Sequence, residues 1–264
     1  MIKLIATDID GTLVEDGSLN LNPEYYDVIR ELRKRGVLFA AASGRQRSSI
    51  EKVFVPVLDD MIFISENGTC IYSKDYQYVD QIQPEVVRAF IDEARRCPGC
   101  EVGVNQDNMG YYENIGIYQH LVQDYGYRGE LVDNICDYSE GVCKISIFHH
   151  SNAEQAVGKD FLERWNRVMH VTVSGKLWVD GANKNVNKGS ALKHFQDEYG
   201  ISPDETLAFG DNINDIEMLQ RASHSFAVAN ARDEVKEAAN FVTASNREDG
   251  VLQVLKAVIR GELC

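Results

Sequence analysis

The sequence lacks a hydrophobic run long enough to cross a bilayer, and it lacks an excess of positive charge. No stretch approaches the roughly 20 apolar residues that a transmembrane helix needs. Lys and Arg number 27 against 41 Asp and Glu, which gives a net charge of −14. This acidic balance argues against nucleic acid or an anionic membrane surface as the main partner, although it leaves room for a local cationic pocket.

Signals for export and for disulfide stapling are also missing. The amino terminus has no basic region followed by an apolar core and a small-residue cleavage site, so we expect a cytoplasmic protein. Cysteine occurs only six times in 264 residues. A chain of this length can bury a sizeable core without disulfides, and we therefore expect reduced thiols.

Four of these cysteines raise the question of a redox or metal site. Cys97 and Cys100 have redox-motif spacing, but they follow a predicted helix, whereas a thioredoxin-like pair opens one. A zinc site with Cys136 and Cys143 would have irregular spacing. Ordinary buried or loop cysteines are the expectation, with metal or redox use as the open alternative.

What the chain does contain is an alternation of short apolar runs with helical patterns. Buried strands are predicted at 2–7, 37–42 and 61–64, with helical patterns between them. This order predicts a parallel sheet with right-handed crossovers. The turn signal at 65–68 adds a hairpin to a further strand at 69–72. The same rhythm returns after Lys188, so the fold class is α/β, a Rossmann-like core with a parallel sheet flanked by helices.

The middle of the chain has a different texture. Residues 83–184 combine predicted helices, including one over 152–168, with short strands, such as those at 171–173 and 176–179, that look antiparallel. We interpret them as an inserted α+β domain, and residues 1–82 with 185–264 as the core domain. Its aromatic side chains either line a substrate face or belong to its core. These are Tyr111, Tyr112, Tyr118 and Trp178.

Polar residues follow three of the predicted core strands. Asp8 and Asp10 end the first strand, Ser43 and Gly44 follow the second, and Asp211 follows the strand at 206–209. Strand ends of a parallel sheet share one edge, where open α/β sheets bind ligands. That edge would also collect Asn214 and Asp215, with Lys188 at a nearby helix start.

Several carboxylates in one cleft require compensation. Two unit charges about 4 Å apart repel by about 4 kcal/mol at an effective dielectric constant near 20, so such a cluster calls for a cation. Mg²⁺ fits an all-oxygen ligand set and commonly takes one or two carboxylates plus a substrate phosphate oxygen. The strand-end cluster therefore points to phosphoryl chemistry.

At this point the motifs resemble those of a known family. The segments DIDGTLV at 8–14, SGR at 43–45, Lys188-Gly189 and GDNINDIEML at 210–219 are similar to the four ordered motifs of haloacid dehalogenase superfamily phosphatases. The ENG turn at 66–68 and the α+β insertion resemble the Cof-type branch, which includes sugar-phosphate phosphatases. The resemblance spans the whole chain and implies a Rossmann-like core with a mobile cap at 83–184.

The resemblance also implies roles for individual residues. Asp8 would be the nucleophile that forms an aspartyl-phosphate, and Asp10 would protonate the leaving oxygen and then activate water. Ser43 and Lys188 would hold phosphoryl oxygens. Mg²⁺ would bind Asp8, the backbone carbonyl of Asp10, and Asp211, with Asp215 binding it directly or supporting it. The remaining substrate-side or phosphate-binding candidates are Gly44, Arg45, Asn67 and Asn214.

Some of these positions have plainer interpretations. Lys188 could be a solvated helix-start lysine, Ser43 a helix N-cap, Arg45 a helix-start surface charge and Asn67 a turn former. The fourth motif also departs from the branch pattern, because Asn212 stands where glycine is usual. Asparagine tolerates positive φ better than most residues, so we expect the turn to survive.

The sequence thus predicts a Mg²⁺-dependent phosphatase of small phosphorylated metabolites, with sugar phosphates as the expected substrate class, acting as a monomer or dimer. Two alternatives stay open. A phosphomutase or phosphotransferase would pass the phosphoryl group to an organic hydroxyl, and a non-catalytic module would only bind a phospho-ligand. Having Asp8, Asp10, Lys188 and Asp211 together argues against the binding module.

Overall fold

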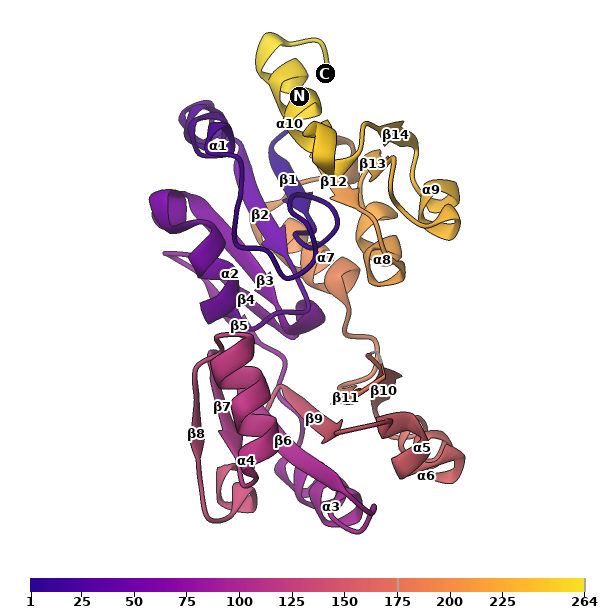
Figure 1. Ribbon diagram of the computed structural model, residues 1–264. Coiled ribbons are helices and arrows are strands. Elements are labelled where there is room, and N and C mark those ends of the chain that lie inside the picture. Colours follow the sequence, from indigo (N-terminus) through magenta and orange to yellow (C-terminus); the bar gives the residue numbers. More distant parts are fainter. Residues whose placement is uncertain (175, 264) are drawn as a thin grey trace. The chain divides into compact units, whose positions relative to one another are not determined.

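A computed structural model describes residues 1–174 and 176–263 (Figure 1). Contacts divide the described chain into two compact units. The first joins Met1–Tyr78 to the chain from Asn187 onward, and the second is Val79–Val186. The domain boundaries expected at residues 83 and 184 stay a prediction. No helix of the described chain combines the length and the apolar character that a bilayer crossing requires.

The first unit is built on an eight-stranded sheet in the order β14-β13-β12-β1-β2-β3-β4-β5. Pairing is parallel from β14 through β3, and β4 runs antiparallel to β3, which confirms the predicted hairpin. The strands are β1 (Leu4–Thr7), β2 (Leu38–Ala42), β3 (Met61–Ser65), β4 (Cys70–Tyr72), β5 (Gln77–Val79), β12 (Thr206–Gly210), β13 (His224–Val228) and β14 (Phe241–Thr243).

Helices flank this sheet, as the α/β prediction requires. They are α1 (Glu24–Lys34), α2 (Arg47–Val53), α7 (Lys188–Tyr199), α8 (Ile216–Leu219), α9 (Asp233–Ala238) and α10 (Gly250–Arg260), with short turns η1 (Val55–Asp60), η2 (Glu66–Gly68), η5 (Pro203–Glu205), η6 (Ile213–Asp215) and η7 (Asn246–Glu248). Helix α1 packs on α10, and α7 packs on α8. The fold class predicted from the sequence is confirmed.

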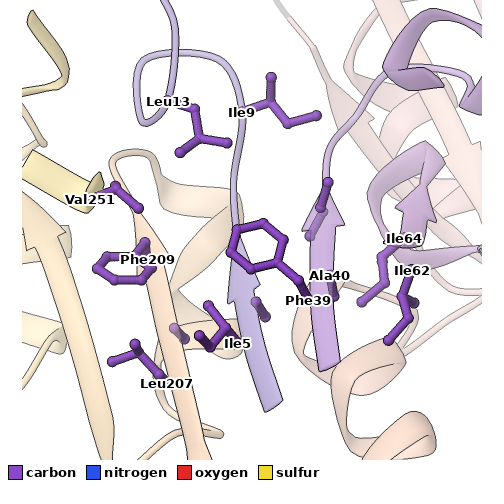
Figure 2. Close-up of a cluster of buried hydrophobic side chains, with 14 of the residues drawn as sticks. Ile5, Ile9, Leu13, Phe39, Ala40, Ile62, Ile64, Leu207, Phe209 and Val251 are labelled. Carbon is purple, nitrogen blue, oxygen red and sulfur yellow. The ribbon is translucent and has the colours of Figure 1, made fainter. Parts of the chain in front are cut away.

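The core of this unit lies around the central strands. Figure 2 shows Ile5 of β1 between Phe39 of β2 and Leu207 of β12. Strands buried on both faces read as nearly continuous apolar runs, which is why β1 and β12 are buried along their length and are apolar apart from Thr7 and Thr206. Ile9 and Leu13, beyond the end of β1, join the same cluster and are 0% and 4% exposed. These two anchors on either side of Asp10 fix the loop that carries it.

The second unit contains a six-stranded sheet in the order β10-β11-β9-β6-β7-β8. Its strands are β6 (Cys100–Gln106), β7 (Met109–Tyr112), β8 (Gly129–Leu131), β9 (Lys144–His149), β10 (His170–Val173) and β11 (Trp178–Ala182). Its helices are α3 (Pro84–Ala94), α4 (Ile115–Tyr118), a π-helix η3 (Gln119–Asp124), η4 (Ile135–Tyr138), α5 (Ala153–Val157) and α6 (Lys159–Trp165).

Three details of the second unit differ from expectation. The single helix predicted over 152–168 is two helices, because Gly158 takes φ +77° between α5 and α6. The strand predicted at 176–179 is β11, which begins at Trp178 and runs to Ala182. The pairs are antiparallel as expected except that β7 and β8 are parallel.

Candidate active site

The predicted nucleophile lies at the end of the central strand. Asp8 follows β1 directly, its N–H donates to the carbonyl oxygen of Phe209 at 3.0 Å, and its side chain is buried. Gly11 then takes φ +80°, and a Cβ at that position would lie 2.4 Å from Oδ2 of Asp211. Only glycine lets the loop pass this close to that carboxylate.

Lys188 joins two of the predicted acidic residues. Its Nζ donates to Oδ1 of Asp8 at 2.5 Å and to Oδ1 of Asp215 at 2.7 Å. Lys188 is only 1% exposed, so the interpretation as a solvated helix-start lysine is wrong. A capping box between Asn187 and Ser190 fixes the first turn of α7 and thereby the lysine at its first position.

Asp215 also organises the turn after β12. Its Oδ2 accepts from the N–H groups of Asp211 and Asn212, each at 3.0 Å, and the residue is 0% exposed. The turn forms as expected, but Asn212 has φ −123°, which is extended backbone, so the tolerance of asparagine for positive φ is not needed here. Its side-chain oxygen accepts from the N–H of Ile213, which gives the asparagine a role in the turn.

One group of carboxylates has the spacing of a metal site. Oxygen atoms of Asp8, Asp211 and Asp215 lie within 4.8 Å of one another, the one such group of His, Cys, Asp or Glu in residues 1–174 and 176–263. Thr12 donates from Oγ1 to Oδ1 of Asp211 at 2.7 Å. Our sequence reasoning missed Thr12, although its place two residues after Asp10 in the first motif could have identified it.

The charges of this group favour a cation. Burial, then the charge of Asp215, raises the pKa of Asp8 well above its usual range, against the opposing effect of Lys188. Burial likewise raises the pKa of Asp211 to about 6. Burial alone would lower the pKa of Lys188, but Asp215 and Asp8 raise it above its ordinary value. Three carboxylates face one ammonium group, so a hard divalent cation fits this oxygen-donor set.

Asp10 lies outside that group and pairs with Arg45. The guanidinium contacts both carboxylate oxygens, with Nε donating to Oδ2 at 2.7 Å and Nη2 donating to Oδ1. Only 11% of the Arg45 side chain is exposed, so its interpretation as a surface charge is wrong. Ser43 is buried and its Oγ accepts from the N–H of Arg45 at 3.1 Å. Helix α2 is capped at Gln46, so Ser43 is not its N-cap.

The asparagines predicted near the substrate lie together. Asn214 donates from Nδ2 to Oδ1 of Asn67 at 3.0 Å. Asn67 has φ 57°, which fits its turn-forming role, and a Cβ on Gly44 would lie 3.2 Å from its amide. The structure therefore brings Gly44, Asn67 and Asn214 to one place in the first unit.

Two further asparagines, which our sequence reasoning missed, hold the loop after β1. Asn230 donates from Nδ2 to the carbonyl oxygen of Gly11 at 2.7 Å, and Asn246 donates to that of Val14 at 3.2 Å. Asn246 also donates its N–H to Oδ1 of Asn230 at 3.0 Å. No local pattern links residues so far apart, since both asparagines follow strands on the opposite side of β12.

The cysteines of the described residues belong to no metal-ligand group. Cys70, Cys97, Cys100, Cys136 and Cys143 are free thiols, and Cys264 lies outside the described residues. Burial raises the pKa of the Cys97 thiol, and it raises that of Cys100 to about 11. No set of three metal-ligating atoms forms around them in the described chain.

Comparison with known proteins places this arrangement in a family. Residues 5–255 match the model of the haloacid dehalogenase-like hydrolases, and the chain belongs to that family. It is 38% identical to a protein of Eubacterium rectale of known crystal structure, with a TM-score of 0.92, covering 97% of this chain and 99% of that one. The family resemblance noted from the motifs is confirmed.

Curated relatives of similar length carry phosphatase names. The chain is 27% identical to the 5-amino-6-(5-phospho-D-ribitylamino)uracil phosphatase YbjI of Escherichia coli, over 99% of this chain and 97% of that protein. It is 26% identical to the phosphoglycolate phosphatase of Staphylothermus marinus, over 98% of each. The chain is an enzyme of this hydrolase family.

Proposed function

We propose that this chain, a phosphomonoester hydrolase of the haloacid dehalogenase-like family, uses Mg²⁺ and an aspartyl-phosphate intermediate to hydrolyse small phosphorylated metabolites. The observation that carries the proposal is the buried Lys188 bridging Asp8 and Asp215 beside Asp211. Sugar phosphates and related polyol phosphates are the proposed substrates. A relative is named for a phosphoribityl compound, which supports that class.

Asp8 is the proposed nucleophile. A carboxylate oxygen of Asp8 attacks phosphorus, the bond from phosphorus to the substrate oxygen breaks, and the phosphoryl group is carried on Asp8. Lys188, 2.5 Å from Oδ1 of Asp8, orients the carboxylate and offsets charge on the phosphoryl oxygens. Water then attacks the same phosphorus atom, releasing inorganic phosphate and restoring Asp8.

Asp10 is the proposed acid and base. It donates a proton to the departing substrate oxygen in the first step and accepts one from the attacking water in the second. Its position two residues after the nucleophile, between the buried Ile9 and Leu13, supports this role.

Mg²⁺ is the proposed cofactor, and the donor set fits it. Asp8, Asp211 and the main-chain carbonyl of Asp10 would hold the ion, with Asp215 supporting the turn or binding directly. When bound, the ion supplies positive charge that neutralises the carboxylates and the phosphate. Because both oxygens of Asp215 already accept from Lys188 and backbone N–H groups, the supporting role suits it better.

Phosphate recognition is proposed for the remaining strand-end residues. Ser43 offers a buried hydroxyl, and the absence of a side chain at Gly44 leaves room beside the Asn67 amide. Asn67 and Asn214, joined by their 3.0 Å hydrogen bond, offer amide donors from two different loops. Arg45 was also predicted near the substrate, but its guanidinium is bonded to Asp10, so we do not assign it to phosphate recognition.

The test is phosphate release from a panel of sugar, polyol and aryl phosphates with Mg²⁺. Asp8→Asn should lower turnover of every substrate by at least about 10⁴-fold, because the amide is not a nucleophile. Asp27→Asn, an exposed carboxylate on α1, is the matched control and should keep full activity. Undiminished turnover by Asp8→Asn would sink the mechanism.

Product analysis separates the alternatives. Inorganic phosphate in amounts equal to the alcohol product supports hydrolysis. An isomerised or newly phosphorylated organic product would identify a mutase or transferase instead. Tight binding of a phosphorylated ligand without any turnover would identify a binding module.

A further inference from the structure

The carboxylate of Asp10 accepts three hydrogen bonds although the residue is partly exposed. Oδ1 accepts from Nη2 of Arg45 and from the N–H of Gly17 at 2.8 Å, while Oδ2 accepts from Nε of Arg45 at 2.7 Å. A two-point contact between a guanidinium and a carboxylate fixes the plane of the carboxylate as well as its distance. Asp10 therefore has one orientation in this structure.

Arg45 also fixes the loop in which Asp10 lies. Its Nη2 donates to the carbonyl oxygen of Ser18 at 3.1 Å, so one guanidinium joins both ends of the 10–18 loop. On the other side, Asn230 and Asn246 hold the carbonyl groups of Gly11 and Val14. Arg45 is thus the charged residue among the three side chains that position the whole loop, the others being Asn230 and Asn246.

The two carboxylate oxygens of Asp10 accept different numbers of hydrogen bonds. A carboxylate oxygen has two lone pairs. Two donors occupy Oδ1, whereas Oδ2 has a single donor among the described residues. Oδ2 therefore keeps a lone pair that can carry a proton while Oδ1 stays bonded.

We propose that Arg45 is a positioning residue that acts through Asp10: its guanidinium orients the carboxylate so that Oδ2 exchanges the proton with the leaving oxygen and with water. This rests on the acid and base role of Asp10 in the proposed function. The proton moves from Oδ2 to the departing oxygen as the bond to phosphorus breaks, and Oδ2 takes one from water in the second step. No further reactant is needed.

The test compares two substrates that differ in their need for an acid. An alkyl phosphate such as glycerol phosphate has a poor leaving group, whereas p-nitrophenyl phosphate has a good one and needs little protonation. Asp10→Asn should lower kcat for the alkyl substrate about 10²-fold or more and affect the aryl substrate much less. Arg45→Gln should give the same selective pattern, lowering alkyl kcat by about tenfold to a hundredfold because the acid is misplaced.

A double variant isolates the coupling. If Arg45 acts only through Asp10, then Arg45→Gln should cause no more than about a twofold further loss in the Asp10→Asn background. Arg45→Lys keeps the positive charge but loses the two-point contact with the carboxylate. Its kcat values should therefore resemble those of Arg45→Gln more than those of the wild type. Arg30→Gln removes an exposed ion pair on α1 and is the matched control, with both substrates unaffected.

Several outcomes would overturn the proposal. A rise in KM for both substrates with kcat retained would show that Arg45 binds the phosphate directly. Additive losses in the double variant would show that it acts independently of Asp10. If Asp10→Asn slowed both substrates equally, the acid role in the proposed function would fail, and that result is visible without any Arg45 variant. Circular dichroism of Arg45→Lys checks that the fold is intact.

Discussion

The two units of the molecule treat buried polar groups differently. In the first unit, charged side chains are buried at the carboxyl ends of parallel strands, with Asp8, Lys188 and Asp215 at most 5% exposed. In the second unit, Lys144 is the one buried charged side chain among the described residues. On the sheet face that bears Ser146 and Asn105, hydrogen bonds join Ser146 to Asp180 and Tyr112 to Asn105. Only the first unit contains a set of three potential metal ligands among the described residues.

We interpret this difference as a separation of chemistry from recognition. Burying charge costs several kcal/mol per ion unless partners compensate, so a cluster of several buried charges marks a candidate site of chemistry. Neutral polar groups and aromatic rings contact a ligand at a lower cost. The second unit brings Trp178 and Phe148 of its sheet together with His120 of η3, with ring centroids 4.8 to 5.6 Å apart. We therefore expect turnover to depend on the first unit and substrate choice on the second.

Metal removal should have the largest effect on turnover, because it acts on the charged site of the first unit. EDTA should lower turnover of every phosphate substrate by at least about 10³-fold, because the acidic group loses its neutralising cation. Adding Mg²⁺ should restore it, as measured by phosphate release. Binding of Mg²⁺ should be weakened in Asp211→Asn and unchanged in Asp180→Asn, an acid of the second unit. Full hydrolysis in EDTA would remove the metal from the mechanism.

A change in the second unit should alter selectivity instead. Trp178→Leu should shift the ratio of kcat/KM between a sugar phosphate and p-nitrophenyl phosphate by about tenfold. The reason is that losing one apolar contact between a pocket and its substrate is worth about 1–3 kcal/mol. Tyr111→Leu is the matched control, because Tyr111 packs against Tyr138 on the opposite face of the sheet. Equal losses of kcat/KM for both substrates would contradict the assignment of substrate choice to the second unit.

The smallest effect is a pH dependence of stability in EDTA. The pKa of Asp211 is raised to about 6 from an ordinary value of 3.8, so folding favours its protonated form. This contribution is present below about pH 4 and is lost as the pH rises through about 6. Allowing for partial exposure, we expect about 1 kcal/mol. Relative to the wild type, Asp211→Asn should gain that amount between pH 4 and pH 6 in urea unfolding. A constant difference would contradict the shift.

Much of the first unit could be predicted because its signals are local. The apolar runs of β1, β2 and β3 end on polar residues, and a parallel sheet aligns strand ends whatever connects them. That rule brings Asp8, Ser43 and Asp211 to one edge without knowledge of any contact. The burial of Lys188 was harder to foresee, since a single lysine at a helix start is usually solvated.

The parts that could not be predicted depend on long-range contacts. The Arg45 to Asp10 pair spans 35 residues, and the Asn230 to Gly11 bond spans 219. In the second unit, short elements such as β8 and α4 carry too few residues for a periodic pattern. Tyr112 is fully buried, which favours the core interpretation for that aromatic residue.

The residues of the site lie far apart in the sequence, and this has a consequence for synthesis on the ribosome. Asp8 emerges 180 residues ahead of Lys188, and Asp215 follows 27 residues later still. At about 5–20 residues per second, roughly 10 to 40 seconds pass before Asp8 meets both partners. The second unit, a continuous segment, is synthesised entirely within that interval. A nascent chain that stalls before residue 188 would therefore hold the nucleophile but not the ammonium group that orients it.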